Sequence, residues 1–298
     1  MSFLYLNIGY GDMFDDSTFT TENSLLYNKR DGISFKNGSG KIKLPSTPKL
    51  LCGKLNVISE TGAISGLSIS IEANGTSKKF IIGFTSDNAF YQCNDLDSRY
   101  VLCDNIVTSA YGVNTLWFYI IPTSSSTDGM LQCVLNGKFL FNVNDSNIGF
   151  PNDCYIKISS TNSDLHLFNF IMADQQFDYS CEVVLCNSVI TTEMEENDNG
   201  YIVTGDGQTL IHKLDVSDLI NTYTKKANVL GMSLANVYNS GTPPCISLNS
   251  MEKKNNSYKT NETFYIESES GYVQSSMFLT NLTLNNMKNR AYGWSVKG

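Results

Sequence analysis

Residues 115–143 read TLWFYIIPTSSSTDGMLQCVLNGKFLFNV, and this stretch decides the fold class. Along residues 116–121 successive side chains point to opposite faces of a strand, and Pro122 ends the run because it cannot donate to a sheet ladder. A polar loop at 124–129 leads into a returning strand at 130–135. Asn136-Gly137 then predicts a type I′ turn, with positive φ at both residues, before a third strand at 138–143. The stretch therefore predicts an antiparallel meander within a β-sandwich.

The same strand pattern extends along the chain in both directions. Residues 31–45, DGISFKNGSGKIKLP, predict a hairpin that turns at residues 37–40, and LSISIE at 67–72 alternates strictly. Short strands with turn residues every 8 to 12 positions or so, as in the first 174 residues, are typical of a sandwich or barrel. Strands resume from Tyr179 on, and residues 215–218 offer caps for one short helix. We expect an all-β protein of two tandem jelly-roll-like β-sandwich domains, residues 1–174 and 178–298, with at most one short helix.

Composition narrows the classes of partner. The chain has 298 residues and a net charge of −8, and no cluster of basic residues exceeds a pair, so nucleic acid is not expected as a partner. No run approaches the roughly 18 apolar residues of a membrane span, so membrane insertion is not expected. Residues 2–6 are apolar but follow no positive residue, so we expect no signal peptide and folding in a cytoplasm.

The chain contains 8 cysteines, without any Cys-x-x-Cys pair. In a chain expected to fold in a cytoplasm, this pattern favours buried reduced thiols over a disulfide framework or a zinc site. We expect neither a metal nor another cofactor.

The first half resembles a laminin-G or concanavalin-type jelly roll. The resemblance rests on the DGISFKNGSGKIKLP stretch, on LWFYI at 116–120, on VLNGKFLFNV at 134–143 and on the late strand LHLFNFIMAD at 165–174. In that group a tryptophan-bearing strand precedes a strand that ends in Asn-Gly, and the last strand pairs near the first. The resemblance implies a jelly-roll fold for residues 1–174, of a kind that includes both lectins and glycosidases.

The last residues, FLTNLTLNNMKNRAYGWSVKG at 278–298, resemble the C-terminal end of small β-sandwich modules in bacteriophage virion proteins. In those modules a Thr-Leu-x-x-Leu/Met segment, here Thr283 to Met287, leads into a closing strand with aromatic residues around a glycine, here residues 292–296. The resemblance implies a structural role in a virion that is assembled in the host cytoplasm.

No catalytic residue is predicted. The two histidines are His166 and His212, and neither a Gly-x-Ser-x-Gly nor a His-Glu-x-x-His motif is present. Glu267 and Glu269 have the spacing that places two carboxylates on one strand face, as in jelly-roll glycosidases, and a solvated strand face explains them equally well.

The best candidate for ligand binding is SDNAFYQCNDLD at 86–97, interpreted as a loop. Sugar sites on jelly rolls combine an aromatic platform with Asp and Asn side chains. In this stretch those groups are Asp87, Asn88, Tyr91, Asn94 and Asp95.

Taken together, the sequence predicts a non-enzymatic structural component of a bacteriophage virion, such as an appendage, a cap or a decoration or fibre protein. The expected partners are other copies of itself and other virion proteins, with host-surface glycans as a further candidate ligand. Two alternatives stay open: a carbohydrate-active enzyme, either a glycoside hydrolase or a lyase, and a free-standing lectin.

Overall fold

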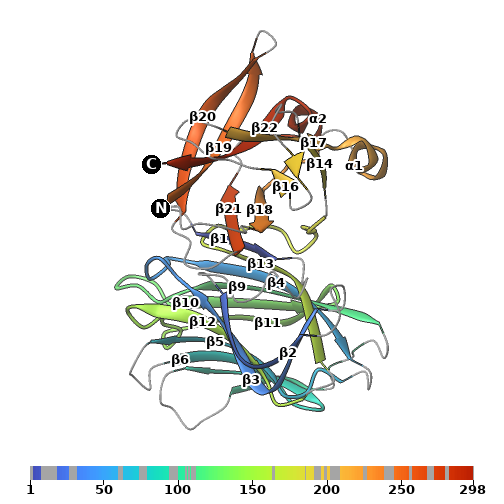
Figure 1. Ribbon diagram of the computed structural model, residues 1–298. Coiled ribbons are helices and arrows are strands. Elements are labelled where there is room, and N and C mark those ends of the chain that lie inside the picture. Colours follow the sequence, from blue (N-terminus) through green and yellow to red (C-terminus); the bar gives the residue numbers. More distant parts are fainter. Residues whose placement is uncertain are drawn as a thin grey trace. The chain divides into compact units, whose positions relative to one another are not determined.

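The structure is a computed structural model in which the chain divides into two compact units, Met1–Val183 and Val184–Gly298 (Figure 1). The described residues are 3–7, 19–26, 32–59, 63–73, 79–93, 100–104, 106, 108, 112–162, 165–184, 186–190, 196–197, 200–201, 209–223, 227–237, 245–254, 257–266, 272–278 and 282–297. Almost all of the regular structure in this part of the chain is antiparallel strand.

In the first unit, thirteen strands of the described part form one continuous hydrogen-bonded sheet. They are β1 (Leu4–Asn7), β2 (Phe19–Leu26), β3 (Ile33–Lys43), β4 (Leu51–Ser59), β5 (Leu67–Ala73), β6 (Lys79–Phe84), β7 (Asn88–Cys93), β8 (Tyr100–Asp104), β9 (Val113–Ile121), β10 (Gly129–Leu135), β11 (Lys138–Asp145), β12 (Cys154–Ser160) and β13 (Leu165–Ala173). The sheet runs β11-β10-β9-β4-β13-β3-β12-β5-β6-β7-β8, with β1 beside β13 and β2 beside β3.

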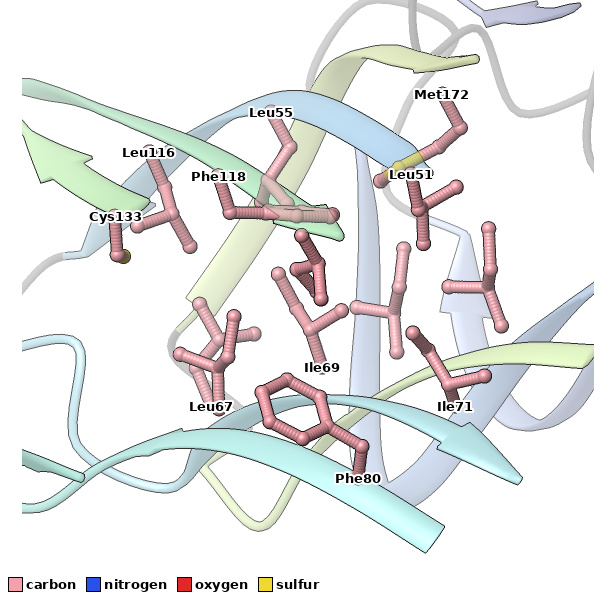
Figure 2. Close-up of a cluster of buried hydrophobic side chains, with 14 of the residues drawn as sticks. Leu51, Leu55, Leu67, Ile69, Ile71, Phe80, Leu116, Phe118, Cys133 and Met172 are labelled. Atoms are coloured by element: carbon pink, nitrogen blue, oxygen red, sulfur yellow. The ribbon is translucent and has the colours of Figure 1, made fainter. Parts of the chain in front are cut away.

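The sheet folds into two layers around one core. Figure 2 shows Phe118 of β9 facing Ile69 of β5 and Phe80 of β6, and all three are at most 2% exposed. Burial of each such side chain contributes about 1.5–3 kcal/mol relative to leaving it exposed. The expectation of an all-β sandwich is confirmed. So is the meander at its centre, where Asn136 (φ 52°) and Gly137 (φ 79°) form the turn between β10 and β11.

One prediction about the first unit is wrong, because residues 33–43 form a single strand instead of a hairpin. Ile33 pairs with Leu167 of β13 in one layer, whereas residues 38–43 pair with β12 in the other. Asn37 (φ 53°) lies in a bulge where three residues of β3 face one residue of β2. The Asn-Gly pair therefore bends the strand from one layer into the other instead of reversing it, as bulges do at sandwich corners.

The segment after β13 packs on the outer face of the first unit. Phe177 is buried, and its carbonyl accepts a hydrogen bond of 3.1 Å from Trp117 Nε1. Lys54 Nζ donates to the carbonyl of Cys181. We expected the second domain to begin at residue 178. Residues 178–183 instead belong to the first unit, and the division of the chain falls after Val183.

The described elements of the second unit form antiparallel sheets of five, two and two strands, and two short helices. They are β14 (Asn187–Ile190), β15 (Glu196–Asn197), β16 (Gly200–Tyr201), β17 (Thr209–Asp215), α1 (Ser217–Thr222), β18 (Gly231–Val237), β19 (Cys245–Lys254), β20 (Ser257–Ile266), β21 (Tyr272–Phe278), α2 (Leu284–Met287) and β22 (Arg290–Lys297). The expected helix is α1. The sequence did not anticipate α2, a single turn whose buried Leu284 and Met287 lie three residues apart on one face.

The cysteines of the first core behave as small hydrophobic residues. Cys52, Cys93, Cys133 and Cys154 are all buried. Burial raises the pKa of the Cys52 thiol, and that of the Cys93 thiol, to about 12, so both stay protonated at neutral pH. Neither helix of the described residues is long and apolar enough to cross a membrane.

Candidate functional site

The predicted sugar-binding loop is largely a strand. Asn88 to Cys93 form β7, and Tyr91 is only 4% exposed. The Tyr91 ring packs against Phe80 and Phe141, and its hydroxyl donates to Asp145 Oδ2 at 2.8 Å. Because the ring points into the core, it is no platform on which a sugar could stack.

The remaining predicted residues do not gather into a described site. Asp87 is exposed in the turn before β7, where Ser86 Oγ donates to its carboxylate. The half-buried Asn88 lies beside it, and its amide, in the orientation that satisfies its neighbours, donates to Asp104 Oδ1 at 2.9 Å. Asn94 and Asp95 lie outside the described residues, as do Glu267 and Glu269. A ligand role for Asp87, Asn88, Asn94 and Asp95 stays a prediction.

A different polar surface lies on the outside of the layer that contains β5 and β12. Ile42, Ile156 and Ile71 point into the core, so the residues that alternate with them point outward. Pairing aligns these outward residues in three rows across β3, β12 and β5. The rows are Ser39, Ser159 and Ser68; Lys41, Lys157 and Ser70; and Lys43, Tyr155 and Glu72. We call this surface the serine–lysine face.

Hydrogen bonds fix several of these side chains. Ser68 Oγ and Ser159 Oγ are 2.8 Å apart, and Ser70 Oγ donates to Glu72 Oε1 at 2.6 Å. The Tyr155 hydroxyl donates to Glu72 Oε2 at 3.1 Å. Burial, and then the negative charge of Glu72, raise the pKa of Tyr155, so its hydroxyl remains a donor at neutral pH. Lys41 Nζ lies 5.4 Å from the centre of the Tyr155 ring, within range of a cation–π contact.

At the serine end of this face the surface is hollowed. The hollow has a volume of about 360 Å³ and is lined by residues 37–39, Gly66, Ser68, Lys157 and residues 159–161. Gly66 has φ +84°, and a Cβ atom there would lie 2.4 Å from Thr161 Oγ1, so only glycine keeps this edge in place.

The described lining of the hollow consists of hydroxyl groups, the amide of Asn37, backbone and one cation. Lys157 is the charged residue among these described lining residues, and none of them carries a carboxylate. Glycoside hydrolysis uses a pair of carboxyl groups about 5 to 10 Å apart, and the described lining does not include such a pair. Within the described residues there is also no group of three His, Cys, Asp or Glu side chains that could hold a metal ion. The hollow is suited to binding a polar ligand through hydrogen bonds.

The two histidines are on strands other than β3, β5 and β12, which supply residues to the lining of the hollow. His166 is on β13, opposite Ile58, and His212 is on β17 in the second unit. Neither belongs to the lining of the hollow.

The sequence contained a partial signal for this face. GSGKIK, LSISIE and CYIKIS each alternate an apolar face with a polar one, so each polar set was predictable as outward. Only the pairing of β3 and β5 on either side of β12 brings the three sets together.

Comparisons by sequence found neither a matching family nor a matching curated protein. Comparison with solved structures found similar folds. The carbohydrate recognition domain of Emp46p, in its metal-free form, has a TM-score of 0.41 and 12% identity over 57% of this chain and 97% of that one. The carbohydrate-binding module CBM66 from Bacillus subtilis has a TM-score of 0.38 and 11% identity over 54% and 98%. Bacillus licheniformis β-glucanase has a TM-score of 0.38 and 10% identity over 59% and 98%.

Proposed function

We propose that the first unit binds glycans without processing them, through the hollow and the adjoining serine–lysine face. The observation that carries this proposal is the lining of the hollow, in which serine and threonine hydroxyls surround a space of about 360 Å³. Sugars present hydroxyl groups that both donate and accept hydrogen bonds, and serine and threonine hydroxyls do the same. The hollow's walls include the paired strands β3, β5 and β12, so ligand binding orders little of the protein.

Among the described side chains of the hollow there is no acid–base pair, which supports binding over catalysis. The described carboxylate on the serine–lysine face is Glu72, whose two oxygens accept hydrogen bonds from Ser70 and Tyr155. A glycosidase needs a second carboxyl group across the sugar from the first. We therefore assign the first unit a non-enzymatic role, with a glycan-processing enzyme as the alternative.

The test is binding of the full chain to a glycan array, followed by titration of the best ligand. Replacing Ser68 and Ser159 together by alanine removes two hydroxyls from the hollow. At about 1 kcal/mol for each lost hydrogen bond, we expect binding to weaken by about tenfold or more. The matched control replaces Ser125 and Ser126, which are exposed in the loop before β10, and we expect it to bind as the wild type does. A silent array, equal losses in both variants or cleavage of the bound glycan would each contradict the proposal.

We further propose that the chain is a structural component of a bacteriophage virion. What supports this is the C-terminal segment that resembles virion modules. Its Thr-Leu segment comprises Thr283 and α2, and its aromatic segment lies in β22, between β17 and β19 in the five-stranded sheet. Many copies on one particle convert weak glycan contacts into high avidity.

The virion setting is tested by the mass of the purified protein in solution and by cross-linking of native particles. We expect a symmetric homo-oligomer and cross-links to other particle proteins. A monomer without particle partners would argue for a free-standing lectin.

A further inference from the structure

The serine–lysine face concentrates positive charge in an acidic protein. The chain has 21 basic and 29 acidic residues and a net charge of −8. Lys41 and Lys157 nevertheless stand directly opposite each other on β3 and β12, and Lys43 follows two residues along β3. Like charges opposite each other on paired strands repel and destabilise the sheet. The stability of the fold therefore does not explain this arrangement.

The described part of the molecule offers these lysines no carboxylate partner. None of its carboxylates lies within ion-pair distance of Lys41, Lys43 or Lys157, and Glu72 accepts hydrogen bonds from Ser70 and Tyr155. On the other side of β3, β2 pairs Thr20 with Lys41 and Glu22 with Ser39. Among the side chains that the structure describes on this face, no carboxylate forms an ion pair with the three lysines, and their positive charge can serve a ligand.

Lys157 connects this charge to the hollow. It is half-buried, and it shares the lining of the hollow with Ser39, Ser68 and Ser159. An ammonium group surrounded by hydroxyl donors is suited to the oxygens of a carboxylate or a sulfate, because charge-assisted hydrogen bonds are shorter and stronger than neutral ones. A ligand with an acidic group at the hollow would also bring its charge close to Lys41 in the next position of the row.

We propose that the ligand of the hollow is an acidic glycan, a chain of sugars bearing carboxylate or sulfate groups, with Lys157 as the principal contact and Lys41 as the second. This inference rests on the proposed function, since it names the class of glycan that the same site binds. The overall charge of −8 repels acidic polymers elsewhere on the protein, so binding depends on this face.

The experiment compares matched pairs of acidic and neutral ligands on the full chain. Oligogalacturonate is titrated beside its fully methyl-esterified form, and dextran sulfate beside dextran, and the same pairs are included on the glycan array. We expect the acidic member of at least one pair to bind at least about tenfold more tightly than its neutral counterpart, and to weaken as salt rises from about 50 to 500 mM. The pair that shows the difference identifies carboxylate or sulfate as the recognised group.

Single substitutions then locate the contact. Lys157→Gln is expected to weaken binding of the acidic ligand by about tenfold and Lys41→Gln by about threefold, with little effect on any neutral glycan. Lys138→Gln removes the same charge from an exposed position at the start of β11 in the other layer, and it is expected to bind as the wild type does. Preference for neutral glycans, or equal losses in the Lys157 and Lys138 variants, would overturn this inference and leave the proposed function standing. Failure of every glycan to bind would overturn both.

Discussion

Among the described glycines of the first unit, Gly53 is the one at which an added Cβ atom would lie nearest to a neighbouring atom. It lies on β4 opposite Phe118 of β9, and a Cβ atom there would lie 2.1 Å from Phe118 Cζ and 2.6 Å from Met172 Sδ. Both neighbours are fully buried, so neither can move aside into solvent. We expect Gly53→Ala to lower the free energy of unfolding by about 1–3 kcal/mol, because it overpacks the core. Urea denaturation of the variant and the wild type measures this loss.

A second substitution separates this clash from a general backbone effect. Leucine in place of Phe118 lacks the far edge of the ring, which is the part nearest the new methyl group. The double variant Gly53→Ala, Phe118→Leu should therefore be more stable than the sum of the two single losses predicts. Strict additivity of the two losses would show that Phe118 is not the obstacle.

Asp145 links the stability of the first unit to pH. Burial works to raise the pKa of its carboxyl group. The backbone N–H of Asn147 (2.8 Å), the Tyr91 hydroxyl (2.8 Å) and the Asn147 amide (2.9 Å) donate to the carboxylate, and these bonds outweigh burial and hold the pKa below its usual range. The carboxyl group of Asp145 therefore binds a proton more readily in the unfolded chain than in the folded one. Its contribution to the free energy of unfolding is present above about pH 4 and is lost as the pH falls below that value.

We therefore expect the free energy of unfolding to fall between about pH 5 and pH 3, and to fall less steeply in Asp145→Asn. Urea titrations at several pH values measure both slopes. The control is Asp128→Asn, in the exposed loop before β10. It also removes a carboxylate, but one that is not surrounded by hydrogen-bond donors as Asp145 is. Parallel slopes in wild type and Asp145→Asn would refute the link.

At the scale of the element, the same dipeptide gives two structures. Asn136-Gly137 reverses the chain between β10 and β11 as predicted. The two strands that flank this dipeptide pair with each other, so the local sequence is enough to define the turn. Asn37-Gly38 was predicted to turn as well, but it forms a bulge because β2, β12 and β13 all pair with the strand on either side of it. Those partners are distant in sequence, and the local pattern contains no information about them.

The candidate site could not be predicted from the sequence for the same reason. Each polar strand face could be predicted from its own alternation, but the rows that join Lys41 to Lys157 and Ser68 to Ser159 depend on register between strands more than 80 positions apart. For the predicted loop at 86–97 the local pattern did contain the information, but its composition was given more weight than its alternation. Its abundance of Asp and Asn favoured a loop, but Ala89, Tyr91 and Cys93 alternate into the core and form a strand.

The segment after β13 has no regular structure, and the Phe177 ring is buried against the first unit, beside the hydrogen bonds that Trp117 and Lys54 donate to the segment's carbonyls. Phe177 is 6% exposed, whereas Tyr179, two residues further on, is 48% exposed. Phe177→Ala should lower the free energy of unfolding by about 3 kcal/mol, because a buried phenylalanine leaves a cavity. Tyr179→Ala should change it by no more than about 0.5 kcal/mol. Denaturant titration of both variants, followed by tryptophan fluorescence, measures the difference, and equal losses would show that the segment does not dock through Phe177.

At the scale of the whole molecule, strand pairing separates the two units. Among the described strands, β1 to β13 pair only with one another, and β14 to β22 do likewise. Each unit also contains its own buried side chains, such as Phe118 in the first and Leu284 in the second. Chains of several domains depart from two-state unfolding, so we expect two transitions on heating, measured by differential scanning calorimetry.

Two substitutions should move these transitions one at a time. Phe177→Ala is expected to lower the midpoint of one transition by several degrees, since a loss of about 1 kcal/mol shifts the midpoint of a domain of this size by about 2–4 °C. Leu284→Ala removes a buried side chain of α2 and should lower only the other midpoint, because it leaves every strand of the first unit unchanged. A single transition that both variants shift together would mean that the two units unfold as one cooperative body.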